Sequence, residues 1–357
     1  MKRRVLVTGA GGVAGVDFVK ALRYTNKYFL LGTDYFTYHL VFPSLDVRFQ
    51  TPKHSDPTFI PMVKKIVEKN GVEFLHPQPT SEARVISEHR EKLPAKIFLP
   101  TPQAMDRGFD KLITARMLEE RGVPVPKTRT INQLEEIEGL FEDLGDTLWV
   151  RVRGGAGGTL SLPCQTPEEA KLWVELWIKK GRAEFSDWMF QEYVGGKDVA
   201  WDSLWFQGRL VTSFSRERLE YPFKHQLPSG VGGTPSASRI IVDEKMNDVG
   251  VKAVLALDEN PHGFYCIDLK YTDKPYVTEV NVGKAHTTLP LWSYGFHRIL
   301  KEPYFNIPDI YVRAGLSGEV PGDIPKFDLF PEGYYLLRHL DCGGWLWRED
   351  GWKKRII

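Results

Sequence analysis

The stretch FYCIDLKYTDKPYVTEVN (264–281) constrains the fold of this chain more than any other part of it. Apolar and polar residues alternate on both sides of a central Asp-Lys pair, which predicts two antiparallel strands joined by a tight turn. With a two-residue turn, Thr272 faces Pro275 and Asp268 lies directly opposite Glu279. The hairpin is therefore predicted to present two carboxylates on one face.

Directly opposed carboxylates repel each other, by roughly 4 kcal/mol at about 4 Å for an effective dielectric constant of about 20. A folded chain tolerates this if one carboxylate is protonated, if a basic side chain intervenes, or if a cation binds. Asn281 lies two residues beyond Glu279 and so on the same face. Oxygen ligands of this kind suit a hard ion such as Mg²⁺ or Mn²⁺. The hairpin predicts either a metal site at Asp268, Glu279 and Asn281 or a solvated surface hairpin.

Length, charge and cysteine usage limit the classes of protein that remain. With 357 residues the chain has room for about two or three domains with their own cores. Lys and Arg (47) balance Asp and Glu (46), so no global field favours nucleic acid or an anionic membrane. Three distant cysteines fit neither a disulfide framework nor a zinc site, and no apolar run approaches membrane-spanning length. We expect a cytoplasmic protein; a homo-oligomer is compatible with these features, which do not identify the oligomeric state.

A glycine-rich turn follows the first predicted strand. Gly9, Gly12 and Gly15 have the spacing of a nucleotide fingerprint, and the second strand ends in Asp34. One interpretation is an NAD(P)-dependent oxidoreductase in which the glycines seat a pyrophosphate and Asp34 holds a ribose. The other is that the glycines only permit a tight turn and close helix–strand packing. The α/β pattern continues to about residue 105 and predicts a Rossmann-like first domain.

A second glycine-rich loop, RGGAGGT (153–159), differs from the first because it joins a strand to a strand. A Walker-type loop must open a helix, so that motif is excluded. A glycine-rich hairpin tip can instead lie over phosphates with its N–H groups turned inward. Arg151 and Arg153 alternate on one strand face beside it and would add positive charge. The alternative is a surface hairpin tip without a ligand.

The segment QEYVGGKDVAWD (191–202) predicts a strand, a Gly-Gly break and a second strand. The break at Glu192, Tyr193 and Val194 leaves backbone groups unpaired, as adenine recognition requires, and Asp198 could accept from ribose hydroxyls. The alternative is a plain β-meander with solvated acids. Further along, the polar segment 215–239 is rich in Gly, Ser and Pro and predicts a loop.

In this order, four segments resemble the ATP-grasp superfamily, and most of all the single-unit proteins similar to one half of the carbamoyl phosphate synthetase large chain. They are DKLITARMLEERGVPVPKT, LWVRVRGGAGGT, QEYVGGKDVAWD, and Asp268 together with Glu279-Val-Asn281. The resemblance spans roughly residues 4–290. It implies a mixed α/β and α+β fold with a Rossmann-like pre-ATP-grasp domain (1–105) and a two-lobed ATP-grasp domain with antiparallel sheets (106–300). The small lid lobe would span about 125–195, and a β-rich tail (301–357) would pack on the ATP-grasp lobe.

The resemblance also implies roles for individual residues. The implied ATP-binding residues are Lys111, Arg151, Gly154, Gly155, Gly157, Gly158, Glu192, Tyr193, Val194 and Asp198. The implied ligands of one or two Mg²⁺ or Mn²⁺ ions are Asp268, Glu279 and Asn281. The candidate catalytic cations are Arg218, Lys284 and Arg153, of which Arg218 and Lys284 would meet an acyl phosphate. His286, in the loop after the hairpin, is expected to make local hydrogen bonds.

Three positions depart from the family pattern. Arg151 stands where the family commonly has lysine, Cys266 where many members have arginine, and Val282-Gly283-Lys284 where proline and arginine are usual. The implied activity is that of a ligase in which ATP activates a carboxylate as an acyl phosphate for attack by an amine or other nucleophile, releasing ADP and phosphate. Alternatives are a bicarbonate-phosphorylating, carbamoyl phosphate synthetase-like enzyme, the oxidoreductase, and a nucleotide-binding module without turnover. The sequence identifies neither small-molecule substrate.

Overall fold

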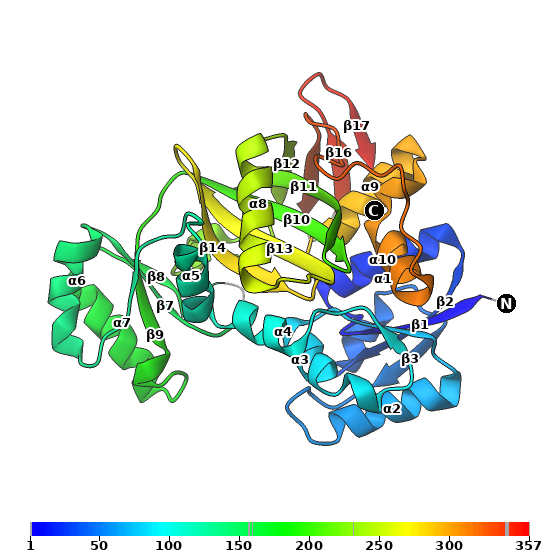
Figure 1. Ribbon diagram of the computed structural model, residues 1–357, viewed down its shortest axis with the longest axis horizontal. Coiled ribbons are helices and arrows are strands. Elements are labelled where there is room, and N and C mark those ends of the chain that lie inside the picture. Colours follow the sequence, from blue (N-terminus) through cyan, green and yellow to red (C-terminus); the bar gives the residue numbers. More distant parts are fainter. Residues whose placement is uncertain (1, 156–157, 159, 231, 340–342, 357) are drawn as a thin grey trace.

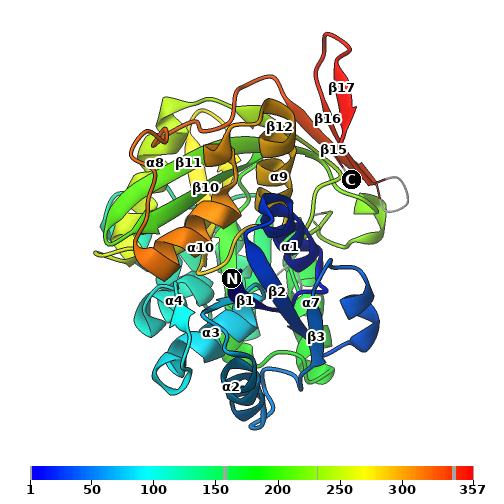
Figure 2. The same ribbon diagram turned by 90° about the vertical axis from the view of Figure 1, so that its right-hand side faces the viewer.

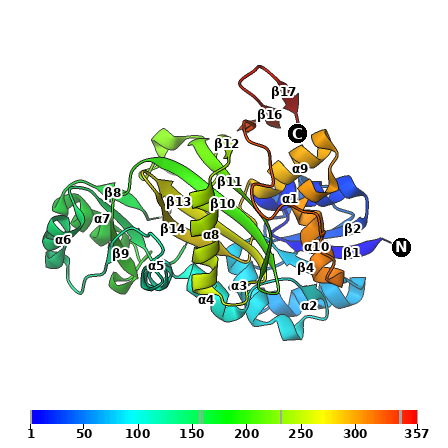
Figure 3. The same ribbon diagram turned by 45° about the horizontal axis from the view of Figure 1, so that its top comes forward.

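The computed structural model describes residues 2–155, 158, 160–230, 232–339 and 343–356, whose strands form three sheets. An eight-stranded sheet lies in the middle of the molecule, a five-stranded sheet lies toward one end and a four-stranded sheet toward the other (Figures 1 and 3). Within the described residues, no helix has both the length and the apolar character needed to cross a membrane.

The five-stranded sheet is parallel, with strand order β3-β2-β1-β4-β5. Its strands are β1 (Arg3–Thr8), β2 (Tyr28–Asp34), β3 (Val47–Gln50), β4 (Phe74–Pro77) and β5 (Lys96–Ile97). Its helices are α1 (Val13–Thr25), η1 (Thr37–Val41), α2 (Phe59–Asn70), α3 (Thr80–Glu88) and η2 (Arg90–Lys92). Along β1, Leu6 packs into one core while Val5 and Val7 pack into another. Both faces of this sheet are covered, which is why its strands are almost wholly apolar (Figure 2).

The first glycine turn is used for packing in this structure. The N–H of Gly11 donates to Oδ2 of Asp34 at 3.1 Å, so this acid is held by the turn itself. A Cβ on Gly15 would lie 2.3 Å from the carbonyl oxygen of Gly9, and one on Gly11 would lie 2.4 Å from Cβ of His39 in η1. These contacts agree with the packing interpretation of the glycines.

The eight-stranded sheet is antiparallel, with order β14-β13-β10-β11-β12-β15-β16-β17. Its strands are β10 (Lys197–Phe206), β11 (Arg209–Glu220), β12 (Ala237–Ile241), β13 (Gly263–Tyr271), β14 (Pro275–Val282), β15 (Tyr335–His339), β16 (Gly343–Trp347) and β17 (Lys353–Arg355). Helix α8 (Glu244–Leu257) covers one face (Figure 1), where Gly250 lets the helix approach the ring of Trp201. The short helix η5 (Lys224–Gln226) lies between β11 and β12 in the chain.

The four-stranded sheet has order β6-β9-β7-β8 and its own apolar core. Its strands are β6 (Thr128–Arg129), β7 (Leu148–Val152), β8 (Leu162–Cys164) and β9 (Trp188–Glu192). Its helices are η3 (Leu134–Glu136), α6 (Ile137–Leu144), α7 (Pro167–Lys179) and η4 (Phe185–Asp187). The second glycine loop joins β7 to the antiparallel strand β8, so the predicted strand–loop–strand arrangement is confirmed.

The remaining helices connect the sheets. They are α4 (Pro102–Phe109), α5 (Lys111–Glu120), α9 (Leu289–Leu300), η6 (Pro303–Phe305) and α10 (Ile307–Ser317). Helices α9 and α10 pack against α1, while β15–β17 continue the eight-stranded sheet beyond β12. The C-terminal tail therefore begins with a helix and touches both sheets; the domain boundaries given above stay predictions.

Two local predictions need correction. Tyr271, and not Thr272, faces Pro275, so the hairpin turn is longer than the two residues expected. One extra residue in β14 then shifts the register back, and Asp268 lies opposite Glu279 as predicted. The predicted loop 215–239 is shorter than expected, because β11 continues to Glu220 and β12 begins at Ala237.

Candidate active site

A cleft lined by many polar side chains lies between the four-stranded and eight-stranded sheets. It brings together most of the residues that the sequence singled out. Those that line it are Arg151, Gly158, Glu192, Tyr193, Val194, Asp198, Arg218, Asp268, Glu279, Asn281 and Lys284. Residues that are far apart in the sequence thus form one site.

Strand alternation explains why the floor of the cleft is polar. In β10, Val199 and Trp201 point into the core under α8, so Asp198 and Asp202 point to the opposite face. Ala200 lies between these two acids and directly across from Asp268 in β13. The small methyl side chain leaves room above the strand for the longer polar groups around it.

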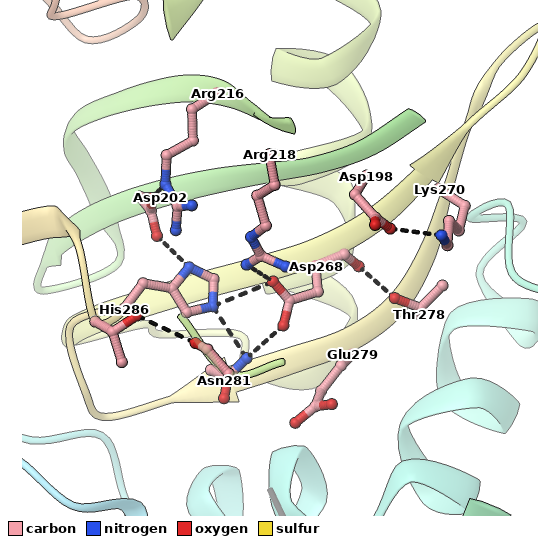
Figure 4. Close-up of polar contacts among 12 residues, drawn as sticks. Asp198, Asp202, Arg216, Arg218, Asp268, Lys270, Thr278, Glu279, Asn281 and His286 are labelled. Atoms are coloured by element: carbon pink, nitrogen blue, oxygen red, sulfur yellow. Dashed lines mark hydrogen bonds and ion pairs between the residues drawn. The ribbon is translucent and has the colours of Figure 1, made fainter. Parts of the chain in front are cut away.

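Asp268 is surrounded by hydrogen-bond donors (Figure 4). Its Oδ1 accepts from Arg218 and lies 3.4 Å from Nε2 of His286, and its Oδ2 accepts from Nδ2 of Asn281 at 3.2 Å. Burial by itself would raise the pKa of Asp268, but Arg218 and His286 outweigh burial and the pKa is lowered. The carboxylate is therefore ionised at neutral pH.

Glu279 has a separate set of cations. Its Oε2 accepts from Arg151 at 3.1 Å, and its Oε1 lies 3.8 Å from Nζ of Lys111. Lys111 also donates to the carbonyl of Gly155 at 2.7 Å, which ties it to the second glycine loop. Burial lowers the pKa of Lys111 to about 8, although Glu279 opposes this shift. Basic side chains therefore offset the charge of both Asp268 and Glu279.

The donor set of this site fits a hard divalent cation. Asp268, Glu279 and Asn281 come from two adjacent strands and line the same cleft, offering two carboxylates and a carboxamide. Oxygen ligands of this kind are those that Mg²⁺ and Mn²⁺ prefer. Their identification as metal ligands stays a prediction.

The other end of the cleft has an apolar wall. Pro126 and Trp149 line it together with Tyr193, whose ring centroid lies 6.4 Å from that of Trp149. Strand β9 ends at Glu192, whose Oε1 accepts from the N–H of Lys127 at 3.0 Å. The predicted strand break is therefore present beside an aromatic surface.

Asp198 and the residues at the start of the second glycine loop contact partners that the sequence did not predict. Asp198 forms an ion pair with Lys270 at 2.5 Å at the edge of the cleft. Arg153 does not line the cleft, because its guanidinium pairs with Asp110, at 3.2 Å from Nε and 2.5 Å from Nη2. Gly154 lies against the ring of Phe109. The predicted phosphate-binding residue Gly157 lies outside the described residues.

A second cavity adjoins the cleft. It is lined by Glu279, Asn281 and Lys284 on one side and by Thr80 and Ser81, the first residues of α3, on the other. Lys284 lines both spaces. The five-stranded sheet therefore places the start of one of its helices beside the candidate metal ligands.

The sequence did not predict a buried group behind the cleft. Nε of Arg216 donates to Oδ2 of Asp202 at 2.9 Å, and Oδ1 of Asp202 contacts Nδ1 of His286. Burial would raise the pKa of Asp202, but Arg216 and His286 hold it far below its ordinary value. The spacing of Asp198 and Asp202 at alternate positions of a strand was a usable signal for a shared face.

Comparison with known proteins identifies the region that holds this cleft. Residues 109–283 match the ATP-grasp domain. This part of the chain is an ATP-grasp domain. The match includes every candidate ATP and metal ligand from Lys111 to Asn281, and it confirms the inferred resemblance to the ATP-grasp superfamily. Lys284 and His286 lie just beyond it.

Relatives and solved structures agree with this assignment. A probable alpha-L-glutamate ligase from Teredinibacter turnerae is 26% identical over 180 residues, 50% of this chain and 56% of that relative. The chain thus spans about half the length of the curated relatives it matches. Biotin carboxylase from Campylobacter jejuni, in a complex described as β-γ-ATP, has a TM-score of 0.69 at 12% identity, covering 95% of this chain and 76% of that one. L-amino acid ligase from Bacillus licheniformis has a TM-score of 0.64 at 13% identity, covering 94% of this chain and 79% of that one. Together with the domain match, these structural likenesses confirm a mixed α/β fold that contains an ATP-grasp domain.

Proposed function

We propose that the chain is an ATP-dependent ligase that activates a carboxylate as an acyl phosphate and transfers the acyl group to an amine. The observation that carries this proposal is the convergence of Asp268, Glu279, Asn281 and Arg151 in one cleft of an ATP-grasp domain. Nζ of Lys111 lies 3.8 Å from Glu279 at this site. Oxygen ligands and cations side by side suit a metal–triphosphate. Relatives and structural neighbours named as ligases support the same reaction class.

ATP would lie along the cleft from the apolar wall to the acids. The base would pack against Trp149 and Tyr193, and Asp198 would accept from the ribose hydroxyls. Arg151 and Lys111 would turn toward the phosphates, because both already lie within reach of Glu279. Their charge would offset that of the triphosphate.

The metal ligands would be Asp268, Glu279 and Asn281. A bound Mg²⁺ or Mn²⁺ would neutralise charge on the β- and γ-phosphates. The chain supplies position and charge: Arg218, paired with Asp268, and Lys284 would face the oxygens of the transferred group. Phosphoryl transfer of this kind needs in-line positioning more than covalent participation of the protein.

The second cavity is the place we assign to the carboxylate substrate. It lies beside Glu279 and Asn281, and Lys284 can reach a carboxylate from either space. The first N–H groups of α3, at Thr80 and Ser81, offer further donors at the positive end of a helix. We propose an amino acid as the amine, and L-glutamate as the first to test, from the names of the relatives.

The experiment measures Mg²⁺-dependent ADP release for pairs of substrates. Each pair combines one carboxylate with one amine, and L-glutamate is among the amines. The expected result is ADP release that needs both substrates. Release that depends on bicarbonate alone would favour the bicarbonate-phosphorylating alternative. Tight ATP binding with no ADP for any pair would favour a module without turnover and would contradict the ligase.

A further inference from the structure

A buried relay of three side chains ends at the candidate metal ligand Asn281. Arg216 and Asp202 are 1% and 0% exposed, and their ion pair lies behind the floor of the cleft. His286, 6% exposed, connects this pair to the cleft: its Nδ1 contacts Asp202 and its Nε2 lies 3.1 Å from Nδ2 of Asn281. Figure 4 shows the four side chains in this order.

The partners of the imidazole fix the orientation of the ring. A carboxylate can only accept, so Nδ1 of His286 carries a hydrogen that points to Asp202. Arg216 holds the other oxygen of Asp202 and keeps the carboxylate in place. The second ring nitrogen, Nε2, therefore faces the cleft and the amide of Asn281.

Asn281 is thereby held from two sides. Its Nδ2 donates to Oδ2 of Asp268 at 3.2 Å and lies 3.1 Å from Nε2 of His286. The same ring nitrogen lies 3.4 Å from Oδ1 of Asp268, so His286 packs against both candidate metal ligands. Asn281 lines both cavities.

We propose that Arg216, Asp202 and His286 form a positioning relay that holds the side chains of Asn281 and Asp268 in place to bind the metal. This inference rests on the proposed function, because it assigns a purpose to residues behind the same site. Hydrogen-bonding partners behind metal ligands typically change metal affinity by about 10–100-fold when removed.

A second metal site in the relay itself does not fit the contacts. Ligand atoms of Asp202, Cys266 and His286 lie within 4.8 Å of one another. Arg216, however, places a positive charge directly on Asp202. Burial also raises the pKa of the Cys266 thiol well above its ordinary value, so the thiol stays protonated and is a poor ligand.

The test measures binding of MnCl₂ in the presence of ADP, by loss of the free Mn²⁺ signal in electron paramagnetic resonance. The variants are His286→Ala, His286→Phe, which keeps a ring without its nitrogens, and His286→Gln, whose carboxamide can still hydrogen-bond to Asn281. His297→Ala is the matched control, because Nδ2 of Asn306 also contacts its ring, at 3.0 Å. ADP affinity without metal is measured for each.

The expected result is about a 10–100-fold loss of Mn²⁺ affinity in His286→Ala and His286→Phe, with ADP affinity unchanged. His286→Gln should recover most of this loss, and His297→Ala should match wild type. Wild-type Mn²⁺ affinity in whichever of the first two variants folds would overturn the relay and leave the proposed function standing. A wild-type protein that binds no Mn²⁺ with ADP would instead overturn the proposed function, and the relay with it.

Discussion

Charge at the site is balanced residue by residue. Asp268 pairs with Arg218, Glu279 with Arg151 and Lys111, Asp202 with Arg216, and Asp198 with Lys270. Each of these acids therefore has a cationic partner, whereas an isolated buried charge would cost several kcal/mol or be neutralised. In the proposed complex, Arg151, Lys111 and Arg218 would exchange these partners for the phosphates of the nucleotide, while the buried pair of Asp202 and Arg216 would stay in place.

Asp198 offers a test of where the ribose lies. Asp198→Asn should weaken ATP binding about tenfold, because a hydrogen bond to a charged group contributes about 1.5 kcal/mol or more. Binding of inorganic tripolyphosphate should not change, since it has no ribose. Isothermal titration of both ligands checks this, with Asp273→Asn in the hairpin turn as the control. Equal weakening of both ligands would show that Asp198 acts through the phosphates instead.

At the scale of single elements, the hairpin was predictable and its details were not. Alternation placed Asp268 opposite Glu279, and the structure confirms this pairing. The turn and the bulge were missed because they compensate: Thr278 is the extra residue, and its Oγ1 donates to the carbonyl of Asp268 at 3.0 Å. Local patterns cannot show such a cross-strand contact.

The relay of Arg216, Asp202 and His286 could not be predicted from the sequence, for a related reason. Asp202 and His286 are 84 residues apart and meet only through strand register and a loop. Alternation in β10 could place Asp202 on the cleft face but could not supply its partner. In the same way, β12 was missed because Gly, Ser and Pro dominate the residues before Ala237.

The contact between α4 and β14 should be sensitive to a single methyl group. A Cβ on Gly108 would lie 2.3 Å from Cγ2 of Val282, whereas nothing lies within 4 Å of a Cβ on Gly139 in α6. Gly108→Ala should therefore destabilise the fold by about 1–3 kcal/mol and disturb the strand that carries Glu279. Gly139→Ala should stabilise it by about 0.5–1 kcal/mol, because alanine favours a helix.

Urea unfolding of both glycine variants, together with ATP titration, measures these effects. Equal stability changes of the same sign would contradict the packing of α4 on β14.

At the scale of the whole molecule, the five-stranded sheet is joined to the active-site loop by buried polar contacts. His76 in β4 stacks on Phe18 and hydrogen-bonds to Gln78 at 2.9 Å. Nε2 of Gln78 then donates to the carbonyl of Ala285 at 2.8 Å, next to His286. The position of the loop that carries Lys284 therefore depends on the core of the first sheet.

This junction predicts a loss of stability in acid. Burial lowers the pKa of His76 from 6.5 to about 4, so between these values the unfolded chain binds a proton that the folded chain does not. Stability is fully present above pH 6.5 and falls as the pH decreases toward 4, by about 3 kcal/mol from this group. His76→Phe should lack this part of the decrease. Urea unfolding of both proteins at pH 7.5 and 4.5 measures the difference, and parallel pH profiles would contradict it.

The central claim is that Glu279, with Asp268 and Asn281, serves ATP-dependent formation of an acyl phosphate. Its most direct test is hydroxylamine trapping of the intermediate, with ATP, Mg²⁺ and the carboxylate identified by the substrate screen. Wild type should form one hydroxamate for each ADP released. Asp273→Asn, which changes an exposed acid of the same hairpin, should form both products at the wild-type rate. In Glu279→Gln, the rates of hydroxamate formation and of ADP release should each fall at least about 100-fold. Hydroxamate formation by Glu279→Gln at the wild-type rate would contradict the claim.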